Sequence, residues 1–140
     1  MTSILSDWAS EFLHEDHVAV ISTLNKDGSP QVTTIWYLLQ EDGTLIMSTP
    51  GRTQKVQNLR RDPRIAVCVG AERRSVSLYG RVTISEDQDV IRQDLERLSA
   101  HYIKDEAARA PALSFFLQEG RVALHVKPVK VTEFSLDQGH

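Results

Sequence analysis

The chain has 140 residues, of which 41% are hydrophobic and 25% are charged, and its formal net charge is -3. This length suits one domain with its own hydrophobic core, which we expect to span residues 1–140, and the composition excludes an intrinsically disordered chain. The mildly negative charge argues against general binding to nucleic acid or to an anionic membrane surface.

The sequence carries no recognisable segment for export or membrane insertion. Met1–Asp7 lacks the basic start and the long apolar core of a secretory signal, and no apolar stretch approaches the roughly 20 residues that span a bilayer. We therefore expect a cytoplasmic protein without a membrane partner.

The first part of the chain predicts one helix followed by strands. Trp8 and Phe12, together with Leu5, recur at helical spacing and predict a helix over Ser6–Glu15 with these side chains facing inward. Runs rich in β-branched and aromatic residues then follow, separated by turns at Asn25–Gly28 and at Glu41–Gly43. The expected strands are Val18–Leu24, Gln31–Gln40 and Thr44–Met47.

The second part predicts more strands and two further helices. A capping serine and early acids at Ser85–Asp87 begin a helix that ends near Tyr102, with Val90, Ile91, Leu95 and Leu98 on its buried side. A short helix is expected at Pro111–Leu117. The expected strands are Arg64–Val69, Ser75–Ser85, Arg121–Lys127 and Val129–Phe134, the last two separated by Pro128. The single cysteine, Cys68, has no partner for a disulfide within the chain, and we expect it to be a buried strand residue.

These elements amount to six or seven strands interrupted by helices. We predict an α+β domain in which an antiparallel sheet closes into a small barrel, because closure removes exposed sheet edges.

The segment Ser48–Arg64 carries the clearest chemical signal. A turn at Pro50–Gly51 leads from a strand into a short helix that stops at Asp62–Pro63. Free backbone amides at such a helix start attract phosphate, and Arg52 and Lys55 add two positive charges on the same side. The segment therefore predicts a site for the phosphate of a cofactor.

Other basic residues admit a plainer interpretation. Arg60, Arg61 and Arg64 could simply solvate an exposed helix face. With Arg73 and Arg74 they could also contact nucleic acid, but aromatic residues are not interleaved among them and the chain is acidic, so we expect no nucleic-acid partner.

Side chains for acid–base, nucleophilic or metal chemistry are not grouped in the sequence. His14 and His17 lie three residues apart without a third ligand nearby, and no Ser-His-Asp or Cys-His arrangement is apparent. We expect no metal site and cannot name a catalytic side chain. His125 on a late strand, and Tyr79 and Arg81 on an earlier one, are candidates for a pocket or a subunit contact.

The order of these motifs resembles the pyridoxamine 5'-phosphate oxidase-like split β-barrel proteins, which bind FMN or the deazaflavin coenzyme F420. The resemblance covers nearly the whole chain. It rests on five blocks, which are Val20–Leu24, Asp27–Gln31, Thr33–Trp36, Arg52–Lys55 and Asn58–Arg64. The last block is the most specific. Within the family, the last two blocks are most similar to the group of F420-dependent enzymes, which also contains FMN binders.

The resemblance implies a cofactor site. Arg52 and Lys55 would hold the phosphate, while Ser48 and Thr49 would offer hydroxyl or backbone hydrogen bonds. The strand that would carry the tricyclic ring matches Gln31, Thr33, Thr34, Ile35 and Trp36. Ile35 and Trp36 could equally be core residues, as apolar strand residues commonly are.

The implied activity is hydride transfer between the bound cofactor, F420 or FMN, and a small unsaturated organic molecule. The family also implies a homodimer with cofactor sites between the subunits. Two alternatives stay open, an FMN-dependent flavoprotein like pyridoxamine phosphate oxidase and a non-catalytic carrier of the cofactor. Oxidation of pyridoxamine phosphate itself is disfavoured, because Thr33 stands where such oxidases place a basic residue.

Overall fold

The computed structural model describes residues 4–136, so that residues 1–3 and 137–140, including Met1–Ser3 and His140, lie outside the described part. One seven-stranded sheet, in the order β2-β1-β5-β6-β7-β4-β3, forms its centre, and all neighbouring strands are antiparallel. The strands are β1 (Ala19–Leu24), β2 (Pro30–Ile35), β3 (Leu38–Leu39), β4 (Leu45–Pro50), β5 (Arg64–Ala71), β6 (Arg74–Ser85) and β7 (Arg121–Ser135). The helices are α1 (Asp7–His14), α2 (Gln54–Arg61), α3 (Gln88–Tyr102) and α4 (Glu106–Leu117).

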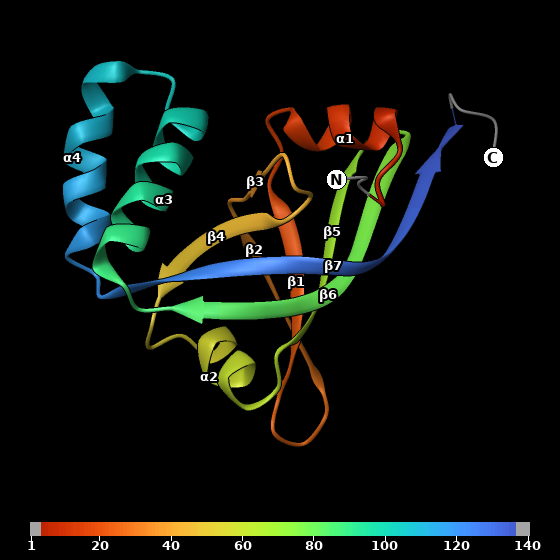
Figure 1. The fold of residues 1–140 in the computed structure, drawn as a ribbon, viewed down its shortest axis with the longest axis horizontal. Helices are drawn as coiled ribbons and strands as arrows, with labels where there is room; N and C mark the ends of the chain where they lie inside the picture. The colour runs from red at the N-terminus through yellow and green to blue at the C-terminus, as the bar shows by residue number, and fades with distance from the viewer. Residues whose placement is uncertain (1–3, 137–140) are drawn as a thin grey trace.

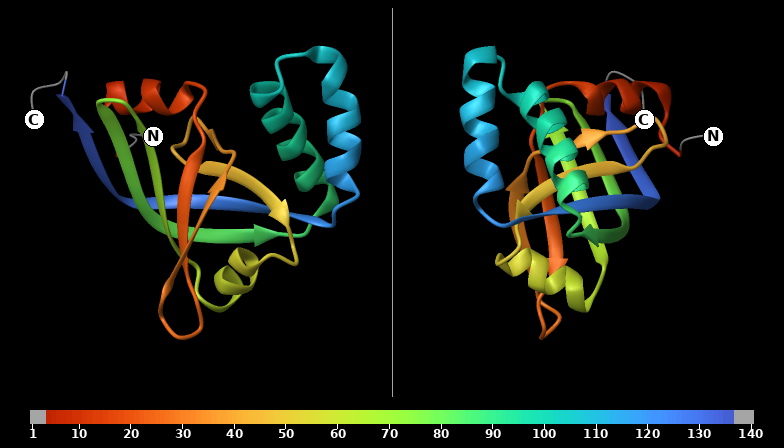
Figure 2. Two further views of the ribbon diagram at one scale, coloured as in Figure 1. Left: turned by 180° about the vertical axis from the view of Figure 1, so that it is seen from behind. Right: turned by 60° about the vertical axis from the view of Figure 1, so that its left-hand side comes forward.

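The sheet curls into a half-barrel because the long strands β6 and β7 bend along their length (Figure 1). Helix α1 lies across one end of the curl, α2 lies near the other end, and α3 and α4 run side by side next to the ends of β4, β6 and β7 (Figures 1 and 2). The predicted α+β architecture with a split antiparallel barrel is therefore confirmed. Among residues 4–136, no helix is long and apolar enough to cross a membrane.

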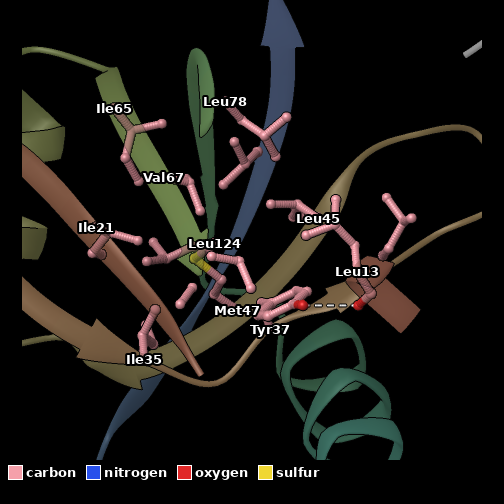
Figure 3. Packing of buried hydrophobic residues seen from close by; sticks show 14 of the residues in the cluster. Leu13, Ile21, Ile35, Tyr37, Leu45, Met47, Ile65, Val67, Leu78 and Leu124 are labelled. Carbon is pink, nitrogen blue, oxygen red and sulfur yellow. Dashed lines mark hydrogen bonds between the residues drawn. The ribbon is translucent and has the colours of Figure 1, made fainter. Parts of the chain in front are cut away.

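The hydrophobic core fills the inside of the curl. Ile21, Met47, Val67, Leu78 and Leu124 reach it from five different strands and are almost completely buried (Figure 3). Alternation along each strand places one side chain in two on this inner face.

Helix α1 closes this core as the sequence predicts. It begins after Ser6, whose Oγ accepts a hydrogen bond from Ala9 N (3.3 Å) and donates one to Glu133. Leu5 and Phe12 are buried, while Trp8 is half-buried and packs against the core.

The expected strand Gln31–Gln40 is wrong as one element, because it is interrupted at Trp36–Tyr37. The side chain of Tyr37 turns into the core, where its hydroxyl donates to Leu13 O (2.8 Å; Figure 3). Its backbone N–H donates to the hydroxyl of Tyr102 (3.2 Å) on α3 rather than to a neighbouring strand. This tertiary contact bends the chain between β2 and β3.

The two expected late strands are a single strand, β7. Pro128 pairs with Gly80 and Lys130 with Tyr79, which leaves Val129 as an extra residue in a β-bulge. Pro128 is tolerated here because a bulge absorbs its missing N–H. The bulge brings the strands so close that a Cβ on Gly80 would lie 2.2 Å from Lys127 O.

Two smaller expectations are also wrong. Helix α4 begins at Glu106 and not at Pro111, because the side chain of Asp105 caps it by accepting from Ala107 N (3.1 Å). Cys68 is exposed, because β5 alternates and turns its apolar neighbours inward and Cys68 outward.

Candidate functional site

A cavity of about 420 Å³ lies between the α3–α4 pair and the strands at the edge of the half-barrel. Its floor comes from the ends of β2, β4 and β7, one side from α2, and its outer wall from the two helices. The lining residues are Val18, Thr34, Ile35, Trp36, Ser48, Thr49, Pro50, Lys55, Leu95, Leu98, Ser99, Phe116 and Arg121.

One end of the cavity is cationic. Lys55 lies in the first turn of α2, which contains no acidic residue, and Arg121 is the first residue of β7 and pairs with Pro50 of β4. Burial lowers the pKa of Lys55, and the nearby positive charge of Arg121 lowers it further. The two cations are therefore close enough to repel each other, and an anion bound between them would relieve that repulsion.

Arg121 is held in place by three neighbours. Its guanidinium donates to Glu119 Oε1 from Nε (3.0 Å) and from Nη2 (2.8 Å), and to Ser48 O from Nη1 (3.1 Å). It also lies over the ring of Phe116, 4.6 Å from the centroid. These contacts fix the cation at the cavity wall before any ligand arrives.

The start of α2 adds backbone donors. The N-cap residue, Thr53, does not cap the helix with its side chain, because its hydroxyl donates to Pro50 O (3.0 Å). Of the first-turn amides, that of Val56 donates to Thr53 O (3.2 Å), and those of Gln54 and Lys55 keep their capacity to bind an anion.

Two residues that line the cavity carry buried hydroxyl groups without a partner among the described residues. Ser48 on β4 and Ser99 on α3 both line it, and among residues 4–136 neither Oγ has a hydrogen-bond partner. Because buried polar groups are normally paired, these atoms on the floor and the helical wall fit a ligand with polar groups on two sides.

The other end of the cavity is aromatic and apolar. Trp36 stacks on Tyr102, with ring centroids 4.7 Å apart and an interplanar angle of 5°, and packs in a T-shaped arrangement with Phe116, with centroids 6.1 Å apart. Because Phe116 also lies under Arg121, this aromatic wall borders the cationic end. Leu95 and Leu98 of α3 complete this wall. A flat, largely apolar ring with an anionic tail matches the two ends, so the residues present fit a flavin-type cofactor.

The structure brings most of the predicted site residues together. Those that line the cavity are Ser48, Thr49, Lys55, Thr34, Ile35 and Trp36. Arg52, Gln31 and Thr33 are not among its lining residues. Arg52 is exposed and donates to Glu119 O (3.3 Å), and Gln31 accepts a hydrogen bond from Thr23 (3.4 Å).

Sequence reasoning missed Arg121 and the helical wall. Arg121 follows Glu119–Gly120 and looks like an ordinary residue at a strand start, and only the pairing of β7 with β4 brings it beside Lys55. Leu98 and Phe116 were recognised as apolar positions, but their spacing alone does not distinguish a cavity wall from the core.

The remaining basic residues near α2 have other contacts. Arg60 lies 3.6 Å from Glu86, Arg64 pairs with Asp62 (2.7 Å), and Arg61 donates to Leu24 O. All three are exposed, which supports the interpretation that they solvate the surface.

The other candidates lie away from the cavity. His125 Nε2 lies 2.6 Å from Asp94 Oδ2 and links β7 to α3. Tyr79 and Arg81 line a separate hollow on the outer face of the sheet.

A curled antiparallel sheet with a cavity that is cationic at one end and aromatic at the other defines a class of protein suited to a flat, anionic cofactor. The family model for pyridoxamine 5'-phosphate oxidase matches residues 5–134, and the chain belongs to this family. One relative, the F420H2-dependent biliverdin reductase of Mycobacterium tuberculosis (strain CDC 1551 / Oshkosh), is 31% identical over 102 residues, which are 72% of this chain and 74% of the relative.

Solved structures agree on the fold. A conserved hypothetical protein from Mycobacterium tuberculosis is similar with a TM-score of 0.77 and 23% identity, over 95% of this chain and 86% of that chain. An F420 reductase is similar with a TM-score of 0.72 and 20% identity, over 91% and 98%. A pyridoxamine 5'-phosphate oxidase-related, FMN-binding protein from Nostoc punctiforme PCC 73102 has a TM-score of 0.72 and 18% identity, over 98% and 88%.

Proposed function

We propose that the protein is an oxidoreductase that uses coenzyme F420 to reduce a small unsaturated organic molecule. The observation that carries this proposal is the cavity with the Lys55–Arg121 pair at one end and the Trp36–Phe116 wall at the other. Membership of the family supports a cofactor of this type, and the 31% identity to an F420H2-dependent reductase supports the choice of F420.

Different residues would bind the phosphate, the ring and the tail of the cofactor. Lys55 and Arg121 hold the phosphate with charge-assisted hydrogen bonds, and Ser48 Oγ offers one more hydrogen bond beside them. Trp36 and Phe116 hold the tricyclic ring, next to the backbone at the end of β2. Arg52, which is exposed beside Glu119 O, would meet the part of the tail that leaves the cavity.

When bound, the cofactor supplies the hydride chemistry. Among residues 4–136, those that line the cavity include no carboxylate, histidine or cysteine, so the contribution of these lining residues is to bind, orient and exclude water. A substrate that accepts a hydride at an activated double bond suits this arrangement, and biliverdin, the substrate in the relative's name, is the first to test.

The proposal includes a homodimer. Val20, Val32, Tyr79 and Val129 are exposed by 40%, 63%, 45% and 69% on the outer face of the sheet. Val18, which is 47% exposed, lines the cavity two residues before Val20 and joins this apolar surface to the open side of the cavity. A second copy seated there would cover the cofactor.

Light scattering should give the mass of a dimer. The variant Val32→Asp should give a monomer that binds the cofactor more weakly. A wild-type monomer with full cofactor affinity would contradict the proposed dimer.

Single-turnover reoxidation tests the activity. Protein loaded with reduced F420 is mixed without oxygen with biliverdin, a quinone or an enone, and the return of the oxidised absorbance is followed. Reoxidation faster than that of free cofactor, and lost in a Lys55→Met/Arg121→Met double variant, is the expected result. Tight binding without accelerated reoxidation by any acceptor would instead indicate a carrier, and a preference for FMN would indicate a flavoprotein that uses FMN.

A further inference from the structure

The net positive charge at the cationic end of the cavity is smaller than its two cations, Lys55 and Arg121, suggest. Glu119 does not line the cavity, but its carboxylate receives two hydrogen bonds from the guanidinium of Arg121, at 2.8 and 3.0 Å. The side chains are only 15% and 22% exposed, for Arg121 and Glu119 respectively, so water screens the pair little. Of the two cations that line the cavity, Lys55 therefore supplies most of the net positive charge, while Arg52 lies outside the lining and contacts Glu119 O.

The local fold places Glu119 there. Helix α4 ends at Leu117, and Gly120, with a φ of 70°, turns the chain sharply into β7. Because Glu119 and Arg121 flank this glycine, their side chains meet on one side of the turn. The negative end of the α4 dipole points to the same region and adds to the effect of the carboxylate.

The charge of a phosphate group depends on its ester linkages. A terminal phosphomonoester, as in FMN, carries about two negative charges near pH 7, because its second pKa is about 6. The phosphodiester of F420, which joins the ribityl chain to the rest of the tail, carries one, and the carboxylates of that tail would lie outside the cavity, where water screens them. A fixed negative charge behind Arg121 opposes a dianion about twice as strongly as a monoanion, since Coulomb energy is proportional to charge.

We propose that Glu119 is a specificity-determining residue, which biases the phosphate site towards phosphodiesters such as F420 and against phosphomonoesters such as FMN. The inference rests on the proposed function, because it takes the Lys55–Arg121 end as the site of the cofactor phosphate. It assigns the discrimination between the two cofactors to a carboxylate that does not line the cavity.

Fluorescence titration of the full chain tests this with three ligands at one fixed salt concentration. FMN and F420 report on the two phosphate types, and riboflavin, which has no phosphate, reports on the ring alone. The key variant is Glu119→Gln, which keeps a hydrogen-bond acceptor for Arg121 and removes the charge. Glu119→Asp keeps the charge, and Glu41→Gln, in the exposed turn before β4, changes the net charge by the same amount away from the cavity.

In Glu119→Gln we expect the affinity for F420 to rise about threefold and that for FMN about tenfold, because the dianion feels twice the repulsion. Riboflavin affinity should stay constant, and Glu119→Asp and Glu41→Gln should keep the wild-type ratio of FMN to F420. Equal changes for FMN and F420, or no change, would overturn the role of Glu119 while leaving the cofactor site intact. If the wild type bound neither cofactor, the proposed function would fail and the inference with it.

Discussion

Replacing Lys55 by methionine should separate ligand binding from folding. Methionine keeps most of the length and apolar contact of the side chain but removes its charge. The lost contact to phosphate is a hydrogen bond to a charged group, which contributes about 1.5 to 3 kcal/mol, or roughly 10- to 150-fold in affinity. We therefore expect binding of F420 and of FMN to weaken by this factor, as measured by fluorescence titration.

The same substitution should not destabilise the unliganded protein at pH 7. Burial, and then the charge of Arg121, lower the pKa of Lys55 below its usual value of 10.5. The folded chain thus holds this proton more weakly than the unfolded chain, and the ammonium ion costs stability at every pH below the folded pKa. As the pH rises through the folded pKa towards 10.5, the cost disappears, so the free energy of unfolding of the wild type should rise relative to Lys55→Met.

Urea unfolding at pH 7 and at pH 10 measures this difference, provided that both proteins unfold in two states. Arg60→Met is the matched control, because Arg60 lies on the same helix, contacts Glu86 and is not part of the cavity. Unchanged ligand affinity in Lys55→Met, or an equal loss in Arg60→Met, would refute the reasoning. So would a clear loss of stability without ligand.

Three further substitutions test the framework around the cavity. Asn58→Ala should lower the free energy of unfolding by about 2 kcal/mol in urea, because the buried amide of Asn58 donates to two side chains of the β1–β2 hairpin, each at 3.0 Å; a neutral effect would contradict this. Gly80→Ala should cost about 1 to 3 kcal/mol in the same assay, since its Cβ would meet Lys127 O at 2.2 Å, and unchanged stability would show that the bulge adapts freely. Tyr102→Phe should keep the stack on Trp36 but lose the hydroxyl that holds the bend after β2, shifting tryptophan fluorescence and weakening cofactor binding, whereas an unchanged spectrum and affinity would exclude a positioning role.

Periodicity and turn residues were sufficient to predict the framework. The Pro-Gly turn at Pro50–Gly51 and the stop at Asp62–Pro63 correctly predict helix α2 and hence the position of Lys55. The strand Ser75–Ser85 and the helix ending at Tyr102 also follow local pattern and match the structure closely.

The errors occur where tertiary contacts override local pattern. The bend at Trp36–Tyr37 depends on Tyr102, which lies 65 residues from Tyr37 along the chain. The continuity of β7 through Pro128 depends on a bulge opposite Gly80, and the residues around Pro128 do not by themselves predict this bulge.

The cationic end of the cavity could likewise be predicted only in part from local sequence pattern. Lys55 was recognisable because it lies in a motif, whereas Arg121 joins it only through the pairing of β4 with β7. The same motif predicts Arg52 as a second phosphate ligand, yet its side chain is exposed and contacts the backbone of Glu119.

A crystal structure of the protein with bound F420 would locate the phosphate directly. We predict that the phosphorus lies between Lys55 and Arg121, with the ring against Trp36 and Phe116. A phosphate found instead on the outer face of the sheet, for example in the hollow lined by Arg81, would contradict this assignment.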